Sequence, residues 1–144
     1  ERGGMVEDGR RICELAEKEG IRIAVEFHGK TLTDTNESAK RFVEEVGHGN
    51  LGMLWQPTPG MSLVERMEGL KGVLPVLANL HVYHYAGEEY RALEGMEEEW
   101  RGYLEVVRGT GRDHCCLMEF VEGDSVEAFL RDAVVLKRML KGVK

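Results

Sequence analysis

The chain has 144 residues, a hydrophobic fraction of 42% and a net charge of -7, values that fit one globular domain. The excess of Asp and Glu (26) over Lys and Arg (19) argues against a broad nucleic-acid surface, which needs clustered cations. Because no apolar run approaches the ~18 residues that cross a bilayer, and no apolar signal segment follows the N-terminus, we expect no membrane association.

The apolar residues alternate between helical and strand periods along the chain. The expected helices cover residues 5–18, 37–46, 62–70, 97–108 and a last stretch from a cap at Ser125 to about Lys141. The expected strands cover residues 21–27, 51–55, 80–85 and 115–120. Gly20 ends the first helix, and Thr35 or Asn36 caps the second. The third strand is followed by a polar loop through Gly95.

Strands that alternate with helices of this length predict βαβ units and a parallel α/β sheet. Four strands are half the number that closes a TIM-type barrel, and four strands alone leave two open edges. The expected fold is therefore one domain over residues 1–144, with one helix before four strand–helix pairs. It is either a small open sheet or a parallel (β/α)4 half-barrel of TIM-barrel type that something else completes.

The three cysteines are Cys13, Cys115 and Cys116. An odd number with two adjacent residues argues against a disulfide framework and favours a reducing, cytoplasmic location. Cys115 and Cys116 lie in an apolar run, and we expect both to pack as small hydrophobic residues.

Polar side chains gather at the carboxyl ends of the expected strands, where parallel α/β folds bind their ligands. They are Glu26 and His28 after the first strand, Trp55 and Gln56 after the second, His81 and His84 in the third, and Glu119 in the fourth. Two carboxylates that converge in apolar surroundings repel each other, and a divalent cation between Glu26 and Glu119 removes that penalty. With the His81 imidazole and the Gln56 amide oxygen, these ligands suit Mn²⁺, Mg²⁺, Co²⁺ or Zn²⁺.

The same groups suit proton transfer. Two carboxylates, Glu26 and Glu119, on opposite sides of a metal-bound hydroxy-ketone can pass a proton between neighbouring carbons, which is the chemistry of sugar isomerases and epimerases. Structural roles remain open for each residue: either Glu can pair with a cation, His81 can be a core histidine, and Gln56 can cap a loop. Trp55 can be a packing residue rather than a platform for a sugar.

Several segments, taken in order, resemble the C-terminal half of the xylose isomerase-like TIM-barrel superfamily, the sugar phosphate isomerase/epimerase group. They are Ala24-Val25-Glu26-Phe27-His28, Leu32-Thr33-Asp34-Thr35, Leu54-Trp55-Gln56-Pro57, Leu80-His81-Val82, Gly95 with Trp100, and Leu117-Met118-Glu119-Phe120-Val121 with Asp124-Ser125. The resemblance implies that Glu26, His81 and Glu119 hold a metal.

Two positions depart from the family's pattern: Gln56 stands where the family usually has an Asp ligand, and Pro59 where it often has a His. The resemblance implies that Arg91 contacts a substrate phosphate or carboxylate. His28, Trp55 and His84 are the other expected substrate contacts.

The family's first four strands have no counterpart in this sequence, which is therefore either a fragment of a longer chain or a half-barrel that a second copy completes. We expect a second copy as the partner that closes the barrel. The leading hypothesis is a metal-dependent isomerase or epimerase of a small sugar, polyol or sugar phosphate, with Glu26 and Glu119 as catalytic acid–base groups. The competing hypothesis is a non-catalytic half-barrel that keeps the fold, and a third is a metal-dependent hydrolase or lyase on the same scaffold.

Overall fold

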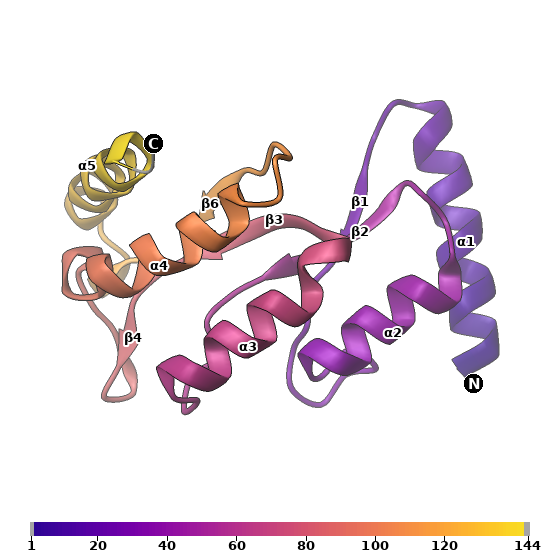
Figure 1. Cartoon of the computed structure of the whole chain (residues 1–144), viewed down its shortest axis with the longest axis horizontal. Coiled ribbons are helices and arrows are strands. Elements are labelled where there is room, and N and C mark those ends of the chain that lie inside the picture. Colours follow the sequence, from indigo (N-terminus) through magenta and orange to yellow (C-terminus); the bar gives the residue numbers. More distant parts are fainter. Residues whose placement is uncertain (1, 143–144) are drawn as a thin grey trace. The chain divides into compact units, whose positions relative to one another are not determined.

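The computed structural model describes residues 2–142, in which strands alternate with helices (Figure 1). The helices are α1 (Arg2–Lys18), α2 (Asn36–Val46), α3 (Leu63–Val73), α4 (Glu97–Arg108) and α5 (Val126–Gly142). One parallel sheet has the strand order β1 (Ile23–Val25), β2 (Leu51–Trp55), β3 (Leu77–Val82) and β6 (Cys116–Met118). One helix followed by four strand–helix pairs confirms the predicted (β/α)4 order.

The predicted helix boundaries have the expected caps. Thr35 is the N-cap of α2, where its Oγ1 accepts a hydrogen bond of 3.1 Å from the backbone N–H of Ser38. Ser125 Oγ accepts one of 3.1 Å from the N–H of Ala128 at the start of α5. Gly20 follows α1 with a φ of 68°, the left-handed conformation that ends many helices.

The strands differ from the prediction in their bounds. β1 and β6 have 3 residues each, shorter than the predicted runs. β3 begins at Leu77, before the predicted start, because Leu77 and Ala78 are 0% and 4% exposed and extend the buried strand backwards. It ends at Val82, so the predicted extension of this strand to residue 85 is wrong.

A short antiparallel hairpin replaces part of the predicted loop. It pairs β4 (Tyr85–Ala86) with β5 (Glu89–Tyr90). Its turn residues Gly87 and Glu88 have φ values of 61° and 68°, as a two-residue type I′ turn requires. Sequence reasoning missed the hairpin because Gly-Glu is not one of the usual residue pairs for this turn.

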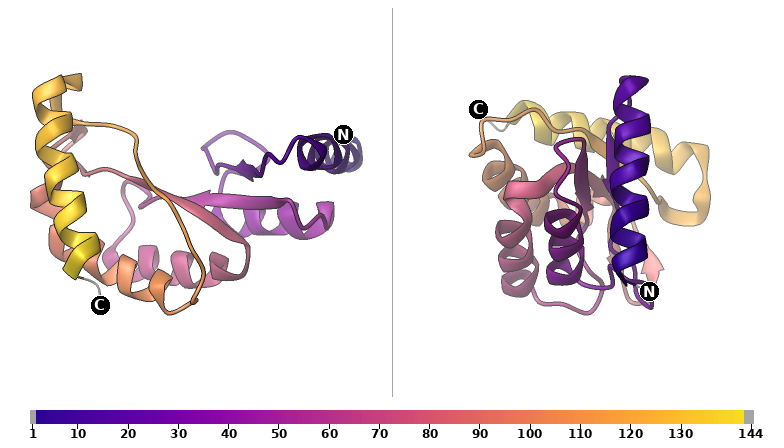
Figure 2. Two further views of the ribbon diagram at one scale, coloured as in Figure 1. Left: turned by 90° about the horizontal axis from the view of Figure 1, so that it is seen from above. Right: turned by 90° about the vertical axis from the view of Figure 1, so that its right-hand side faces the viewer.

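The described residues form two compact units. The first unit is made of two segments, the described chain up to Trp55 and Glu68–Asn79. Its helices α1 and α2 lie side by side, in indigo and violet in Figure 2. In this unit β1 pairs with β2 in register from Ile23↔Leu51 to Val25↔Met53. A side chain at Gly52 would place its Cβ 2.8 Å from that of Ala78, so glycine is what lets β2 and the start of β3 approach.

The second unit comprises Gln56–Met67 and the described chain from Leu80 onward. Trp100 and Tyr103 of α4 are fully buried, and Trp100 Nε1 donates a hydrogen bond of 2.9 Å to the carbonyl oxygen of Tyr83. Helices α4 and α5 pack together, in orange and yellow in Figure 2. This packing anchors the segment that follows β3.

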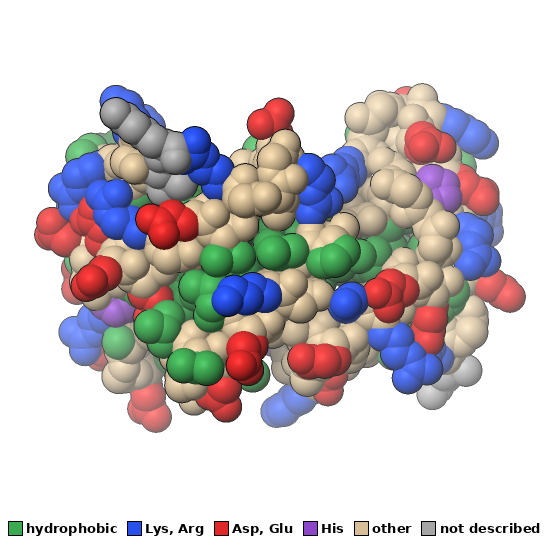
Figure 3. Space-filling view, in the orientation of Figure 1, with side chains coloured by type: hydrophobic (Ala, Val, Ile, Leu, Met, Phe, Trp, Pro, Cys, Tyr) green, Lys and Arg blue, Asp and Glu red, His purple; other side chains and the backbone are tan. Residues whose placement is uncertain are grey.

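The surface mixes charges of both signs, as red and blue side chains show in Figure 3. Cys13 is buried, but Cys115 is exposed, so the expectation that both adjacent cysteines pack as hydrophobic residues is wrong for Cys115. Cys115 lies just before the short strand β6, and its carbonyl oxygen accepts a hydrogen bond of 2.9 Å from the N–H of Leu80 in β3. None of the described helices is long and apolar enough to cross a membrane.

Candidate metal and substrate site

The pairing of β3 with β6 places two of the predicted ligands side by side. The strands are parallel, and His81 lies opposite Leu117. Glu119 follows two residues after Leu117 and therefore shares its face of the sheet. The N–H of Glu119 donates a hydrogen bond of 3.3 Å to the carbonyl oxygen of Val82, which extends the strand pairing to this residue.

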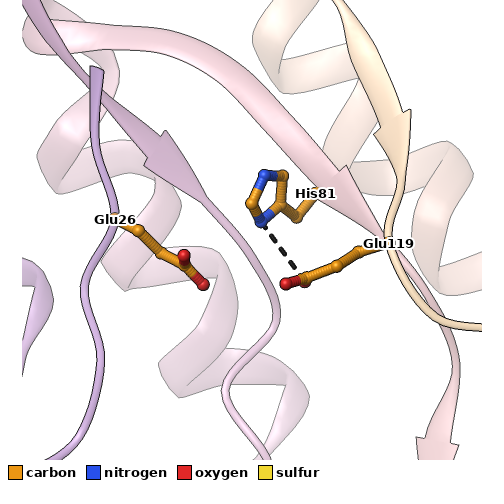
Figure 4. Close-up of side chains that lie close together, drawn as sticks. All are labelled: Glu26, His81 and Glu119. Carbon is orange, nitrogen blue, oxygen red and sulfur yellow. Dashed lines mark ion pairs between the residues drawn. The ribbon is translucent and has the colours of Figure 1, made fainter. Parts of the chain in front are cut away.

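The side chains of His81 and Glu119 contact each other. His81 Nδ1 lies 3.2 Å from Glu119 Oε2, an ion pair that is dashed in Figure 4. The two side chains are 13% and 24% exposed, while Glu119 as a whole residue is exposed. The imidazole is a hydrogen-bonding partner for this partly covered carboxylate.

Gln56 joins this pair from the end of β2. Its Oε1 lies 3.2 Å from the same Nδ1 of His81. His81 Nδ1 therefore faces two oxygen acceptors, and a proton on this nitrogen can hydrogen-bond to either of them. Sequence reasoning predicted this convergence of Gln56, His81 and Glu119, and all three lie in the second unit.

Glu26 belongs to the first unit and follows the last residue of β1. Its backbone oxygen accepts a hydrogen bond of 2.9 Å from Thr33 Oγ1, which fixes the chain where it leaves the strand. Its side chain is labelled in Figure 4, and its carboxylate is of the ligand type that the predicted metal set requires.

The ligand chemistry fits a divalent cation. The second unit supplies an imidazole nitrogen, a carboxylate oxygen and an amide oxygen around one point. Mixed nitrogen and oxygen ligands of this kind are used for Mg²⁺, Mn²⁺, Co²⁺ and Zn²⁺. The amide of Gln56 lacks the charge of an Asp, which lowers the total negative charge that the ligands present.

Two predicted substrate contacts lie in the first unit. Trp55 is 1% exposed and belongs to its core, so its ring offers no face to a ligand from solvent. His28 is exposed, and its Nδ1 lies 3.1 Å from the carbonyl oxygen of Gly29. Of these two, only His28 is accessible.

The other two predicted contacts follow β3. His84 Nδ1 lies 2.7 Å from the carbonyl oxygen of Ala92, and the ring packs on Gly95, where a Cβ would come within 2.7 Å of it. His84 and Tyr85 line a cleft of about 800 Å³ in the second unit. Arg91 is 48% exposed and forms an ion pair of 2.8 Å with Glu89.

An aromatic cluster near Glu119 was missed at the sequence level. Tyr90 and Phe120 stack with ring centroids 4.4 Å apart and an angle of 23° between planes. Tyr83 and Tyr85 contact this pair edge-on. Phe120 stands directly after the predicted ligand, which was a signal, but the position of Tyr90 depends on the unforeseen hairpin.

Comparison with known proteins identifies the fold. No protein-family model matches the chain, and no curated protein matches it. Among solved structures, a xylose isomerase-like TIM barrel protein from Mycobacterium smegmatis in complex with magnesium is similar, with a TM-score of 0.67 and 19% identity. That similarity covers 99% of this chain and 52% of the other.

Two further solved structures are similar over about half of their own length. The probable 3-DHS dehydratase AsbF from Bacillus anthracis, involved in petrobactin synthesis, has a TM-score of 0.64 and 20% identity over 92% of this chain and 55% of its own. The D-psicose 3-epimerase with D-tagatose from Clostridium cellulolyticum H10 has a TM-score of 0.57 and 15% identity over 96% of this chain and 52% of its own. The fold is therefore half of a xylose isomerase-like TIM barrel, as the resemblance implied.

Proposed function

We propose that this half-barrel binds a divalent cation through Gln56, His81 and Glu119 of the second unit, and acts in the isomerisation or epimerisation of a small sugar, polyol or sugar phosphate. The observation that carries the proposal is His81 Nδ1, which lies 3.2 Å from both Gln56 Oε1 and Glu119 Oε2. The similar solved structures include one with magnesium and an epimerase with a ketose sugar.

A bound divalent cation supplies Lewis acidity toward the carbonyl oxygen of a hydroxy-ketone. The residues of the chain then do the proton chemistry. One carboxylate takes the proton from the carbon beside the carbonyl, and the other returns a proton to that carbon or its neighbour. We assign one of these two roles to Glu119, which directly follows β6.

His81 holds Glu119 in place for this step. Its Nδ1, 3.2 Å from Oε2, limits the rotation of the Glu119 carboxylate and so orients it for proton transfer.

The test measures metal binding and proton exchange separately. Calorimetric titration with Mg²⁺ and Mn²⁺ should show binding that falls at least tenfold in Glu119→Gln. Glu127→Gln is the matched control, because Glu127 is an exposed carboxylate in the first turn of α5. Incubation with D-tagatose in D₂O should place deuterium on the carbon beside the carbonyl, as seen by NMR. Equal metal affinity in both variants would refute the proposed site.

A second candidate function is self-association of a non-catalytic half-barrel. The favouring observation is an apolar stripe on α5, where Val126, Leu130 and Val134 recur at helical spacing and are 68%, 60% and 64% exposed. In the first unit, α1 likewise exposes Ile12 and Leu15 at 52% and 54%. Such faces in a parallel α/β fold normally pack against another element.

We propose a second copy of the chain as the partner in this case. Size-exclusion chromatography with light scattering should give the mass of a dimer, and Leu130→Asp should give a monomer. Glu105→Lys changes an exposed charge on a different helix, α4, and should leave the dimer intact. A monomeric, folded wild-type chain at high concentration would rule this partner out.

A further inference from the structure

The stacked rings of Tyr90 and Phe120 form a rigid aromatic surface in the second unit. Their centroids lie 4.4 Å apart. Tyr83 contacts both rings edge-on from behind, at centroid distances of 5.9 Å from Tyr90 and 5.8 Å from Phe120. Tyr83 is itself 5% exposed, and its hydroxyl donates a hydrogen bond of 3.0 Å to the carbonyl oxygen of Pro57. The two rings therefore rest on a buried, hydrogen-bonded support.

This surface lies beside the candidate site. Phe120 follows Glu119 directly in the chain. Burial, and then the negative charge of Glu119, raise the pKa of Tyr90. The geometry agrees with this, because Tyr90 stacks on Phe120, the residue that follows Glu119.

Phe120 remains 37% exposed although an aromatic cluster lies directly behind it. A partly exposed aromatic pair in the same unit as a carboxylate and an imidazole combines an apolar surface with polar groups, which is the usual composition of a small-molecule site. The surface is too small for a protein partner. An aromatic side chain buries about 150–250 Å² in full, whereas a stable protein interface needs about 800 Å² from each partner.

We propose that Tyr90 and Phe120 are the platform for one face of a ring-shaped polyol, a pyranose or a hydroxylated carbocycle, whose hydroxyl groups reach Glu119 and His81. The proposal rests on the proposed function, because it names the substrate class of that same site. A saturated ring with equatorial hydroxyl groups presents a flat face of C–H bonds, which packs on an aromatic surface, while its polar edge meets hydrogen-bonding groups.

An open-chain polyol has no such face. It would leave the exposed ring of Phe120 uncovered, or would lose rotational freedom to cover it. The platform therefore selects cyclic over extended ligands. The two aromatic residues come from different segments, Tyr90 from β5 and Phe120 from the chain just after β6. A flat ligand can rest on both rings at once.

The experiment compares scyllo-inositol with D-mannitol, a ring and an open chain that carry the same number of hydroxyl groups. Saturation-transfer NMR titrations are run on the wild-type chain in the presence of Mg²⁺. We expect scyllo-inositol to bind more tightly than D-mannitol, with saturation transfer from aromatic protons. Removal of one ring in Phe120→Leu or Tyr90→Leu should weaken scyllo-inositol about two- to tenfold and leave D-mannitol unchanged.

Controls separate the platform from general effects. Phe129→Leu removes a 48% exposed ring on α5 outside the cluster and should change neither ligand's affinity. Phe120→Tyr keeps the ring and should restore binding, and circular dichroism checks that each variant is folded. Equal affinity of the two polyols, or normal scyllo-inositol binding in both Leu variants, would overturn the proposal. The Mg²⁺ affinity, measured on the same samples by calorimetry, reports separately on the proposed metal site.

Discussion

Asp132 is a buried carboxylate on α5 whose removal gives a sharp test of how the segment after β3 is held. It is 3% exposed, and its Oδ1 accepts a hydrogen bond of 3.2 Å from the N–H of Leu93. The same oxygen accepts one of 3.0 Å from Arg131 Nε. Leu93 follows Arg91 and Ala92, the residues that pair with the backbone and the imidazole of His84. Asp132 therefore anchors the segment that carries two predicted substrate contacts.

The cost of Asp132→Ala follows from these contacts. Leu93 is 2% exposed, so its N–H loses its acceptor in a place that water does not reach, at about 1–3 kcal/mol. The ion pair with Arg131, whose side chain is 43% exposed, adds little after solvent screening. We expect a loss of about 3 kcal/mol in the free energy of unfolding and a fall in Tm of about 6–12 °C.

Urea unfolding followed by circular dichroism measures this loss, and hydrogen exchange by NMR measures the exposure of the Leu93 amide. Asp132→Asn keeps a side-chain oxygen for that amide and should cost less than Asp132→Ala. Glu122→Ala removes the other, exposed partner of Arg131, at 3.0 Å, and should cost clearly less than Asp132→Ala. If Glu122→Ala were as damaging as Asp132→Ala, or if the Leu93 amide exchanged no faster, the anchoring role would be refuted.

Two further predictions concern packing and thiol chemistry. Gly52→Val should destabilise the chain by about 1–3 kcal/mol in urea unfolding, because its Cβ would lie 2.8 Å from that of Ala78, whereas Gly49→Ala, with open space around the position, should be nearly neutral. Burial, and then the neighbouring Cys115, raise the pKa of Cys116 to about 11, so roughly one thiol in a thousand is ionised at pH 8. Iodoacetamide should therefore modify the exposed Cys115 before Cys116. The rate of Cys116 modification should rise about tenfold per pH unit up to about pH 11. Equal modification rates of Cys115 and Cys116 at pH 8 would contradict the buried environment of Cys116.

The order of elements was predictable because each one carries a local signal. The capping residues Thr35 and Ser125 hydrogen-bond to N–H groups within the same turn, so their effect needs no knowledge of the tertiary structure. Strand bounds were less predictable. β3 begins at Leu77 because neighbouring elements bury Leu77 and Ala78, and that burial depends on residues far away in the sequence.

The candidate ligands were predictable for a different reason. In a parallel sheet the carboxyl ends of all strands lie at one edge, so residues after separate strands converge whatever the helices between them contain. Gln56, His81 and Glu119 follow that rule. The Tyr90–Phe120 stack could not be found in this way, because Tyr90 is placed by a hairpin whose Gly87–Glu88 turn has no strong sequence signature.

Gln56 stands where the resembled family usually has an Asp, and this leads to a last prediction. Gln56→Glu should lower stability without metal and raise the affinity for a divalent cation. Gln56→Glu keeps the length of the side chain and replaces the amide by a carboxylate, beside His81 Nδ1 and therefore near Glu119. Without metal the two carboxylates repel each other, so the unfolding free energy should fall by about 1–3 kcal/mol. With Mg²⁺ or Mn²⁺ the added charge becomes a stronger ligand, so the affinity should rise about tenfold or more and the cation should restore the lost stability.

Thermal unfolding of Gln56→Glu with and without Mg²⁺ measures both effects, and Gln56→Met, which removes the oxygen ligand at similar length, is the matched control. A metal site at His81 requires that Mg²⁺ raise the Tm of Gln56→Glu more than that of the wild type, and that of Gln56→Met least. A site in which Gln56 only caps its loop gives the same Mg²⁺ response in all three proteins. The contrast between the variants thus separates a ligand from a loop residue without any assay of catalysis.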